Sequence, residues 1–260
     1  VLVLSWVWMM GLRAAQTGLR IQTLPSVSPS APGLTRLSAL DLGIDFTNRL
    51  SEERAVTNRN LVSGSGVALA DVDGDGRLDV FLCGLDSLNA MYRNLGDWRF
   101  TNVTARALPG VSWLNPSSGS NDSTGAAFAD VDGDGDPDLL VNQLGGGTRL
   151  WLNDGKGHFE EATDAAGLRS RSGATSMALA DVDGDGFEDV FLSQNRSDLL
   201  PEWSRDDSGS GLWLRGRGDG SFQAMDPAVS GIRIEGEQRA AALADFDHDR
   251  RIDVVVSQIN

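Results

Sequence analysis

Residues Asp71 to Asp79 have the sequence Asp-Val-Asp-Gly-Asp-Gly-Arg-Leu-Asp. Carboxylates occupy positions 1, 3, 5 and 9 of the nine-residue loop, and glycine occupies positions 4 and 6. Residues 68–70 (Ala-Leu-Ala) precede the loop and residues 80–82 (Val-Phe-Leu) follow it. Short apolar runs bounded by turn residues are typical of strands, so the local pattern is strand, acidic loop, strand.

The same pattern returns three more times along the chain. Equivalent loops begin at Asp130, Asp181 and Asp245, so the leading aspartates are 59, 51 and 64 residues apart. Repeats of about this length indicate propellers, solenoids or other repeat arrays. After each of the first three loops an apolar run, a Gly-rich turn and an aromatic residue recur, which is typical of a β-hairpin. These hairpins cover residues 91–100, 150–159 and 212–222.

Each repeat therefore contains four antiparallel strands, which is one propeller blade. No long stretch has helical periodicity, so the predicted class is all-β, a β-propeller of four-stranded blades with calcium loops. We predict about three and a half to four blades, too few to close a ring, and we therefore expect a chain truncated at both ends. Trp151 and Trp213 are predicted to occupy the same place in their hairpins and to pack between blades. The predicted repeats span residues 61–120, 121–173, 174–237 and, incompletely, 238–260.

The acidic loops have the composition of a calcium site. Calcium takes six to eight oxygen ligands, and alternate residues of a tight loop turn their carboxylates toward one centre. Position 7 would add its backbone carbonyl, and glycine at position 6 permits the backbone to reverse. A polar turn without metal is the weaker interpretation, because clustered carboxylates repel one another. The predicted ligands are Asp71, Asp73, Asp75, Arg77 and Asp79; Asp130, Asp132, Asp134, Asp136 and Asp138; Asp181, Asp183, Asp185, Phe187 and Asp189; and Asp245, Asp247, Asp249, Arg251 and Asp253.

The fourth loop departs from the pattern, since His248 and Arg250 replace its two glycines. We expect up to four calcium ions, with the weakest binding at this loop. A helix-loop-helix calcium hand would need glutamate at position 12, and an apolar residue stands there in every loop. These residues are Leu82, Val141, Leu192 and Val256.

The chain of 260 residues carries a net charge of −15 and has a pI of about 4.4. Such an acidic balance argues against nucleic acid as a partner, because phosphates need a basic surface. Four calcium ions would reduce the charge to −7 and so account for about half of the acidic excess. The single cysteine, Cys83, lies in an apolar run and is predicted to be a buried thiol.

Residues 1–15 are similar to the apolar stretch and cleavage region of a secretory signal, and the apolar run is too short to span a bilayer. The alternative is a buried strand or helix. Residues 16–60 are predicted to form a linker, rich in Pro, Ser and Gly at 23–35, and an N-terminal strand region with weak alternation at 43–47. We therefore expect a secreted or cell-surface protein whose mature chain does not insert into the membrane.

Taken together, the repeats resemble the FG-GAP/VCBS family of calcium-loop propellers. The segments 45–48 (Asp-Phe-Thr-Asn), 66–76 and 150–163 are similar to the cartilage-acidic-protein-like, or ASPIC/UnbV, group. The similarity covers roughly residues 42–260. It implies a full propeller of seven or eight blades, secretion and calcium loops, and the C-terminal extension of that group has no counterpart in this sequence.

No arrangement of catalytic type is evident, so we expect no enzyme activity. The two histidines are His158, predicted to be a solvated ring in a turn, and His248. The leading hypothesis is a scaffold that binds an extracellular protein or glycan through its longest irregular stretches, Arg196–Gly211 and Pro109–Ser123. The alternatives are a structural matrix component, a non-catalytic propeller attached to an enzyme domain outside this fragment, and a hydrolase or lyase.

Two further motifs have simpler explanations. Arg217-Gly218-Asp219 spells an integrin-recognition tripeptide, but it lies in a predicted hairpin turn, and turn chemistry explains it. Three Asn-x-Ser/Thr acceptor sites would matter only in a eukaryotic secretory pathway. They begin at Asn102, Asn121 and Asn195.

Overall fold

The computed structural model describes residues 36–57, 61–62, 64–109, 122–144, 146–168, 174–194, 211–234 and 236–259. The chain divides into two compact units, Val1–Leu37 and Ser38–Asn260, and the second contains all the helices and strands of the described residues. The predicted leader at residues 1–15 and the Pro-rich stretch at 23–35 lie outside the described residues.

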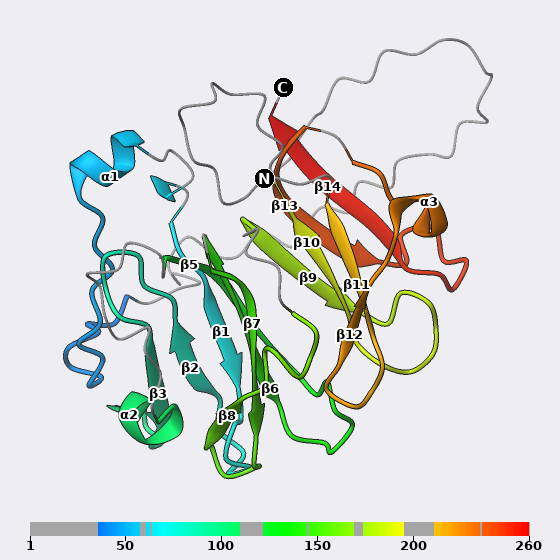
Figure 1. Ribbon diagram of the computed structural model, residues 1–260. Helices are drawn as coiled ribbons and strands as arrows, with labels where there is room; N and C mark the ends of the chain where they lie inside the picture. Colours follow the sequence, from blue (N-terminus) through cyan, green and yellow to red (C-terminus); the bar gives the residue numbers. More distant parts are fainter. Residues whose placement is uncertain are drawn as a thin grey trace, which may run out of the picture. The chain divides into compact units, whose positions relative to one another are not determined.

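The described residues of Ser38–Asn260 form three antiparallel sheets of four strands and one of two strands, and every sheet keeps its strands in chain order (Figure 1). This confirms the predicted all-β class and the four-stranded blade. The first blade contains β1 (Val67–Ala70), β2 (Asp79–Leu82), β3 (Ala90–Asn94) and β4 (Phe100–Asn102). The second contains β5 (Asp122–Ala129), β6 (Asp138–Leu144), β7 (Gly147–Asn153) and β8 (Phe159–Glu161). The third contains β9 (Ser176–Ala180), β10 (Asp189–Ser193), β11 (Leu212–Gly216) and β12 (Phe222–Ala224), and a two-stranded sheet of β13 (Glu237–Ala244) and β14 (Asp253–Ile259) follows.

The first strands of successive blades lie beside one another: β1 contacts β5, β5 contacts β9, and β9 contacts β13. This succession is that of the innermost strands of a propeller, from which the remaining strands of each blade run outward. The backbones approach closely at Gly66, where an added Cβ would lie 2.7 Å from the Cα of Gly125. Glycine is therefore required where the first two blades meet.

Two apolar clusters lie between the blades and hold them together. One joins Phe81 and Met91 of the first blade to Leu139 and Trp151 of the second. The other joins the second blade to the third, and Leu140 belongs to it. Since neighbouring residues of a strand point to opposite faces, β6 supplies Leu139 to one cluster and Leu140 to the other. Blade β5–β8 is thus covered on both faces, and its strand β6 is buried along its whole length.

The prediction that Trp151 and Trp213 occupy the same place was wrong. Trp151 pairs with Leu139, one residue after Asp138, whereas Trp213 pairs with Phe191, two residues after its own loop aspartate. A shift of one residue moves a side chain to the other face of a sheet. Accordingly, Trp151 is 1% exposed in the cluster between the first two blades, whereas Trp213 is only half-buried.

The segment before the first blade contains no strand at residues 43–47, so the predicted N-terminal strand was wrong. Its alternation was weak, and the segment instead makes separate contacts: Phe100 N–H donates to the Leu42 carbonyl over 2.7 Å, and the Tyr92 hydroxyl donates to Asp45. A short helix, α1 (Glu52–Thr57), follows it, and Arg54 of that helix forms ion pairs with Asp86 and Asp122.

The other two helices are single turns, α2 (Thr104–Ala107) and α3 (Pro227–Ser230). None of the helices within the described ranges has the length and apolar content needed to cross a bilayer.

Cys83 is buried, as predicted, at 1% exposure in the cluster between the first two blades. Burial raises the pKa of its thiol to about 12. Because the thiolate is the reactive form, the native protein should react negligibly with Ellman's reagent at pH 8 and with one full equivalent in denaturant. Rapid stoichiometric labelling of the native protein would show that the thiol is accessible.

Candidate metal centre

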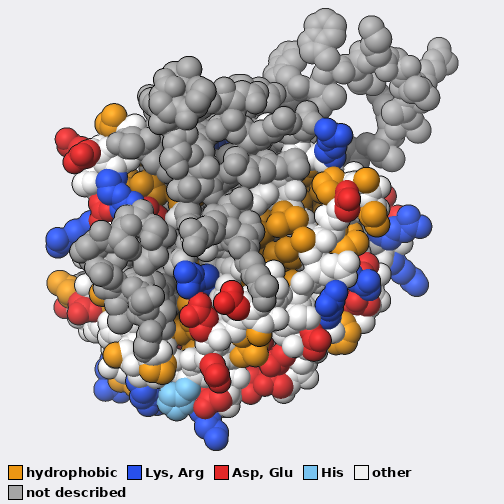
Figure 2. Space-filling view, viewed as in Figure 1, with side chains coloured by type: hydrophobic (Ala, Val, Ile, Leu, Met, Phe, Trp, Pro, Cys, Tyr) orange, Lys and Arg blue, Asp and Glu red, His pale blue; other side chains and the backbone are white. Residues whose placement is uncertain are grey.

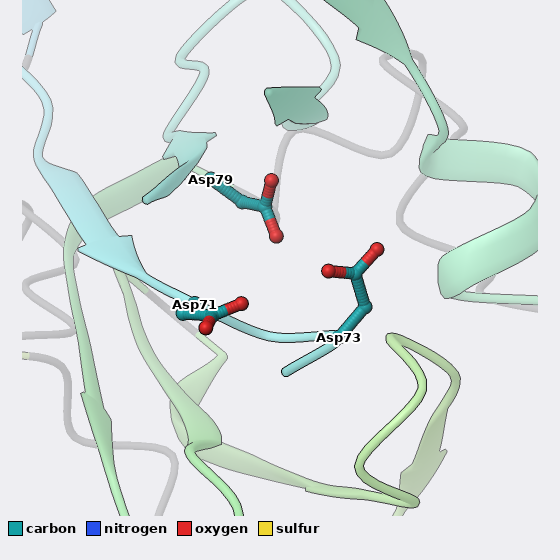
Figure 3. A group of neighbouring side chains, drawn as sticks. All are labelled: Asp71, Asp73 and Asp79. Atoms are coloured by element: carbon teal, nitrogen blue, oxygen red, sulfur yellow. The ribbon is translucent and has the colours of Figure 1, made fainter. Parts of the chain in front are cut away.

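Each of the four loops brings three carboxylates together, at positions 1, 3 and 9. The ligand oxygens of each group lie within 4.8 Å of one another. In the first loop the carboxylates of Asp71, Asp73 and Asp79 face a common space (Figure 3). The other groups are Asp130, Asp132 and Asp138; Asp181, Asp183 and Asp189; and Asp245, Asp247 and Asp253.

The aspartate at position 1 follows the first strand of its blade and closes the loop. Asp71 accepts hydrogen bonds from the backbone N–H groups of Asp75 (3.0 Å) and Gly76 (2.7 Å). The first aspartate of every other loop likewise accepts the position-6 N–H, and it also accepts the N–H of position 4 in the second loop, of positions 4 and 5 in the third and of position 5 in the fourth. These bonds fix the direction of the carboxylate without help from a distant residue, so the loop builds this part of the site locally.

The aspartate at position 9 begins the second strand and connects the loop to the third strand. Asp138 is fully buried and accepts hydrogen bonds from Val131 N–H (3.0 Å) and from Asn153 N–H (2.8 Å) of β7. Its pKa is raised to about 6: burial is the largest cause, the two N–H groups oppose it, and the charges of Asp132 and Asp134 add to it. A cation would relieve this burial of negative charge.

The equivalent aspartates of the first and third loops have the same environment. Asp79 and Asp189 are also fully buried, and burial raises the pKa of each. Each accepts one bond from the loop backbone and one from the third strand of its blade. The aspartate at position 9 therefore connects the loop to the third strand of its blade, and it is also a candidate metal ligand.

Positions 5 and 7 lie outside the three-carboxylate groups. In each loop the position-5 carboxylate accepts the N–H of the position-7 residue, over 3.0 Å from Arg77 to Asp75 in the first loop. Among the residues that the structure describes, only positions 1, 3 and 9 are gathered. The ligand roles of positions 5 and 7, those of Arg77, Asp136, Phe187 and Arg251 included, stay predictions.

The donor set fits a hard divalent cation. Every gathered atom is a carboxylate oxygen, and 4.8 Å is about twice a calcium–oxygen bond of 2.4 Å. In the first loop Asp73 Oδ1 is buried and has no hydrogen-bond partner. A buried polar atom of this kind requires a partner, and a bound cation would supply one.

The loop backbone adopts the left-handed conformation at positions 4 and 6. Gly74 and Gly76 have φ of 70° and 81°, and the glycines of the next two loops are similar. In the fourth loop His248 and Arg250 hold the same conformation, with φ of 65° and 73°. The left-handed conformation is unfavourable by about 1–2 kcal/mol for a residue with a side chain, so the backbone of the fourth loop is strained.

We expect the changes His248→Gly and Arg250→Gly each to raise the free energy of unfolding by about 1 kcal/mol, since each relieves one strained residue. Urea unfolding followed by fluorescence would measure the gain. Arg251→Gly is the matched control, because Arg251 lies outside the left-handed region and glycine there should give no gain. Equal effects at positions 250 and 251 would contradict the assignment of strain.

Each of the first two loops lies against the hairpin of the next blade. The Asn153 side-chain amide donates to the Val72 carbonyl over 2.9 Å, and Gly220 N–H donates to the Val131 carbonyl over 3.0 Å. Both valines occupy position 2 of their loops and are 4% exposed. An ion bound in these loops would therefore stiffen an interface between blades as well as the loop itself.

Sequence reasoning missed two arginines that reach these loops from the third strands. Arg93 of β3 forms ion pairs with Asp73 and Asp75, and Arg215 of β11 pairs with Asp183 over 2.5 Å. Arg215 also pairs with Asp185 over 2.9 Å. The available signal was an arginine at the same place in two of the three hairpins, but only strand pairing shows that it faces the loop.

The surface around the loops is mixed in charge. In Figure 2 acidic side chains gather in the lower part of the view, with basic side chains near them. His158 is exposed in its turn, as predicted, with Nδ1 3.2 Å from Asp154. In the Arg217–Asp219 turn the Asp219 carboxylate accepts Ser221 N–H over 3.0 Å, which is ordinary turn chemistry.

Most of the predicted partner-binding stretches fall outside the described residues, namely 195–210 and 110–121. The acceptor sites at Asn121 and Asn195 fall there too. Asn102 is exposed at the end of β4, where its side chain accepts the Thr104 N–H over 3.0 Å.

Comparison with known proteins agrees with the repeat pattern. The model of the FG-GAP-like repeat matches residues 71–141 and 130–192, which cover the first three loops. Cartilage acidic protein 1 of Homo sapiens is 25% identical over 239 residues, covering 90% of this chain and 33% of that protein. The protein of the same name from Xenopus tropicalis is 24% identical over 230 residues, covering 85% and 32%. The chain thus spans about a third of the length of the curated relatives it matches.

Two solved structures show more distant similarity. The exotype rhamnogalacturonan lyase YesX is 17% identical, with a TM-score of 0.41 over 75% of this chain and 34% of that one. The V. cholerae biofilm matrix protein Bap1 is 18% identical, with a TM-score of 0.31 over 74% and 34%. The assignment rests on the repeat model and on the curated relatives, together with the four loops and the blades that carry them. On this evidence residues 71–192 consist of FG-GAP-like repeats.

Proposed function

We propose that this chain is a calcium-binding β-propeller segment, secreted or displayed at the cell surface, that serves as a scaffold for binding an extracellular protein or glycan. One observation carries the calcium proposal. Four loops, far apart in the sequence, repeat the same three-carboxylate group on the same backbone hydrogen bonds.

Calcium is favoured over magnesium by the kind of loop. Calcium accepts flexible sites with many protein oxygens, whereas magnesium needs near-octahedral geometry at about 2.0–2.1 Å and retains several waters. Carboxylates at alternate positions of a loop, with a backbone carbonyl nearby, supply many protein oxygens at once. The proposal assigns one calcium ion to each loop, with the fourth bound most weakly because its backbone is strained.

The extracellular scaffold role is supported by similarity to cartilage acidic protein 1 over most of this chain. Propellers place their binding surfaces in the loops between strands, and the chain has long connections at residues 110–121 and 195–210. The alternatives are a structural matrix component and a non-catalytic propeller attached to an enzyme domain elsewhere in the protein.

Isothermal titration calorimetry of metal-free protein tests the calcium proposal. Calcium should bind with a stoichiometry above one and up to four, and magnesium should bind more weakly. The matched control replaces the position-3 aspartates, which removes a ligand from every loop and should abolish the heat. These substitutions are Asp73→Asn, Asp132→Asn, Asp183→Asn and Asp247→Asn. The proposal fails if the unmodified protein takes up no calcium.

A glycan array and a panel of extracellular matrix proteins, probed with calcium-loaded chain, test the scaffold role. Saturable binding to at least one partner is expected, and deletion within residues 195–210 or 110–121 should weaken it. A protein that binds none of these partners saturably would instead favour the matrix component.

A further inference from the structure

An arginine on the third strand of the blade reaches the first loop, and another reaches the third loop, where each forms ion pairs with the loop carboxylates. Arg93 pairs with Asp73 and Asp75, and its Nη2 lies 2.9 Å from the Asp75 carboxylate. Arg215 pairs in the same way with positions 3 and 5 of its loop, over 2.5 and 2.9 Å. A position-3 carboxylate is one of the three gathered groups, so each guanidinium contacts, through Oδ2, a carboxylate that the metal would also use.

The second loop has no such arginine at the equivalent place. The backbone N–H groups of Asn94, Asn153 and Gly216 all donate to the position-9 aspartate of their own blade, so these three residues are equivalent. The residue before each is then Arg93, Leu152 or Arg215.

Leu152 packs instead against the apolar cluster between the second and third blades. Within the described part of the chain, no basic side chain forms an ion pair with the acidic residues of the second loop. These residues are Asp130, Asp132, Asp134, Asp136 and Asp138.

The difference has a direct electrostatic consequence. A guanidinium remains charged at any pH that the protein tolerates, so it cannot leave by losing a proton. A calcium ion entering the first or third loop must separate the arginine from the position-3 carboxylate or share that carboxylate with it. Among the described residues no ion-paired arginine has to be displaced from the second loop, so an entering ion gains more of the attraction of the carboxylates there.

We propose that Arg93 and Arg215 are internal counter-cations that lower the calcium affinity of the first and third loops, so that the second loop fills first. This inference rests on the proposed calcium binding. The three loops would then differ in calcium affinity. The second loop would bind calcium at low concentration, and the first and third loops would bind it only at higher concentration, when the ion displaces Arg93 and Arg215.

Single-site proteins allow each loop to be measured alone. Position-3 aspartates are replaced by asparagine in all loops but one, and calcium is titrated by calorimetry. The protein that retains only the second loop should bind calcium roughly three- to tenfold more tightly than the protein that retains only the first, the effect expected of one or two partly exposed ion pairs.

Exchanging the residues should exchange the affinities. In the first-loop protein, Arg93→Leu should tighten binding roughly three- to tenfold and Arg93→Lys should tighten it less, because lysine keeps the charge. In the second-loop protein, Leu152→Arg should weaken binding by a similar factor. Arg106→Leu, at an exposed position of α2, is the control and should leave both affinities unchanged.

The outcomes separate this inference from the calcium proposal. If the unmodified protein binds no calcium, the proposed function itself fails. If the single-site proteins bind calcium with equal affinity and Arg93→Leu changes nothing, calcium binding stands and the counter-cation role is overturned. If the Leu152→Arg variant does not fold, the Arg93→Leu and Arg93→Lys variants still test the counter-cation role, because Arg93 is partly exposed and contributes little to the core.

Discussion

Chelation of calcium is expected to lower the free energy of unfolding by about 2.7 kcal/mol for each loop that had been held at a hundredfold excess over its Kd. The reason is that the assembled group of three carboxylates exists only in the folded chain, so the ion stabilises that state alone. In the metal-free protein the same groups oppose folding, because buried position-9 aspartates such as Asp79 and Asp138 lie beside other carboxylates.

Differential scanning calorimetry with and without EGTA measures the effect. For a unit of this size, 1 kcal/mol corresponds to about 2–4 °C, so each filled loop should raise the Tm by about 5–10 °C. Magnesium added in place of calcium is the control and should restore only a small part of the increase. An unchanged Tm on chelation, in a protein shown to have been loaded, would mean that the loops carry no folding energy.

The location of the loops predicts how the unfolding transition will change. The first two loops contact the hairpin of the following blade through Asn153 and Gly220. Calcium should therefore stabilise the docking of one blade on the next as well as the loop. We expect the metal-free protein to unfold over a broader temperature range, because blades that dock less firmly lose cooperativity.

The change Trp151→Ala is expected to cost about 3–5 kcal/mol of unfolding free energy, the usual range for removing a buried tryptophan. Trp151 is 1% exposed and lies in the cluster that joins the first two blades, together with Phe81, Met91 and Leu139. Its removal would leave a cavity at an interface that the close-packed strands cannot collapse to fill.

Trp213→Ala is the matched control, since Trp213 belongs to the corresponding hairpin of the third blade but is only half-buried. Urea unfolding should show a loss for it that is clearly smaller than the loss for Trp151→Ala. Leu214→Ala, at the place that corresponds to Trp151, should cost about 2–5 kcal/mol because it opens the next interface. Equal losses for the two tryptophans would contradict the one-residue offset between the hairpins.

The repeated unit and most of the candidate site can be predicted from local amino-acid patterns. Asp71, at position 1, closes its loop through the backbone N–H groups four and five residues on, and position 3 is placed by the same turn. The strands on either side follow from alternating or continuous apolar runs. These features are local, so a stretch of about fifteen residues contains all the interactions that fix them.

Features that depend on the pairing between strands could not be predicted from the sequence. The offset between Trp151 and Trp213, and the approach of Arg93 and Arg215 to their loops, follow from the register of the third strand of each blade against the second. Side chains alternate with a period of two, so one residue of offset exchanges core for surface, and no local pattern records it. Residues 43–47 are a further example. Their alternation of side chains is weak and they form no strand, and the contact of this segment with the first blade is made through single hydrogen bonds such as that from Tyr92 to Asp45.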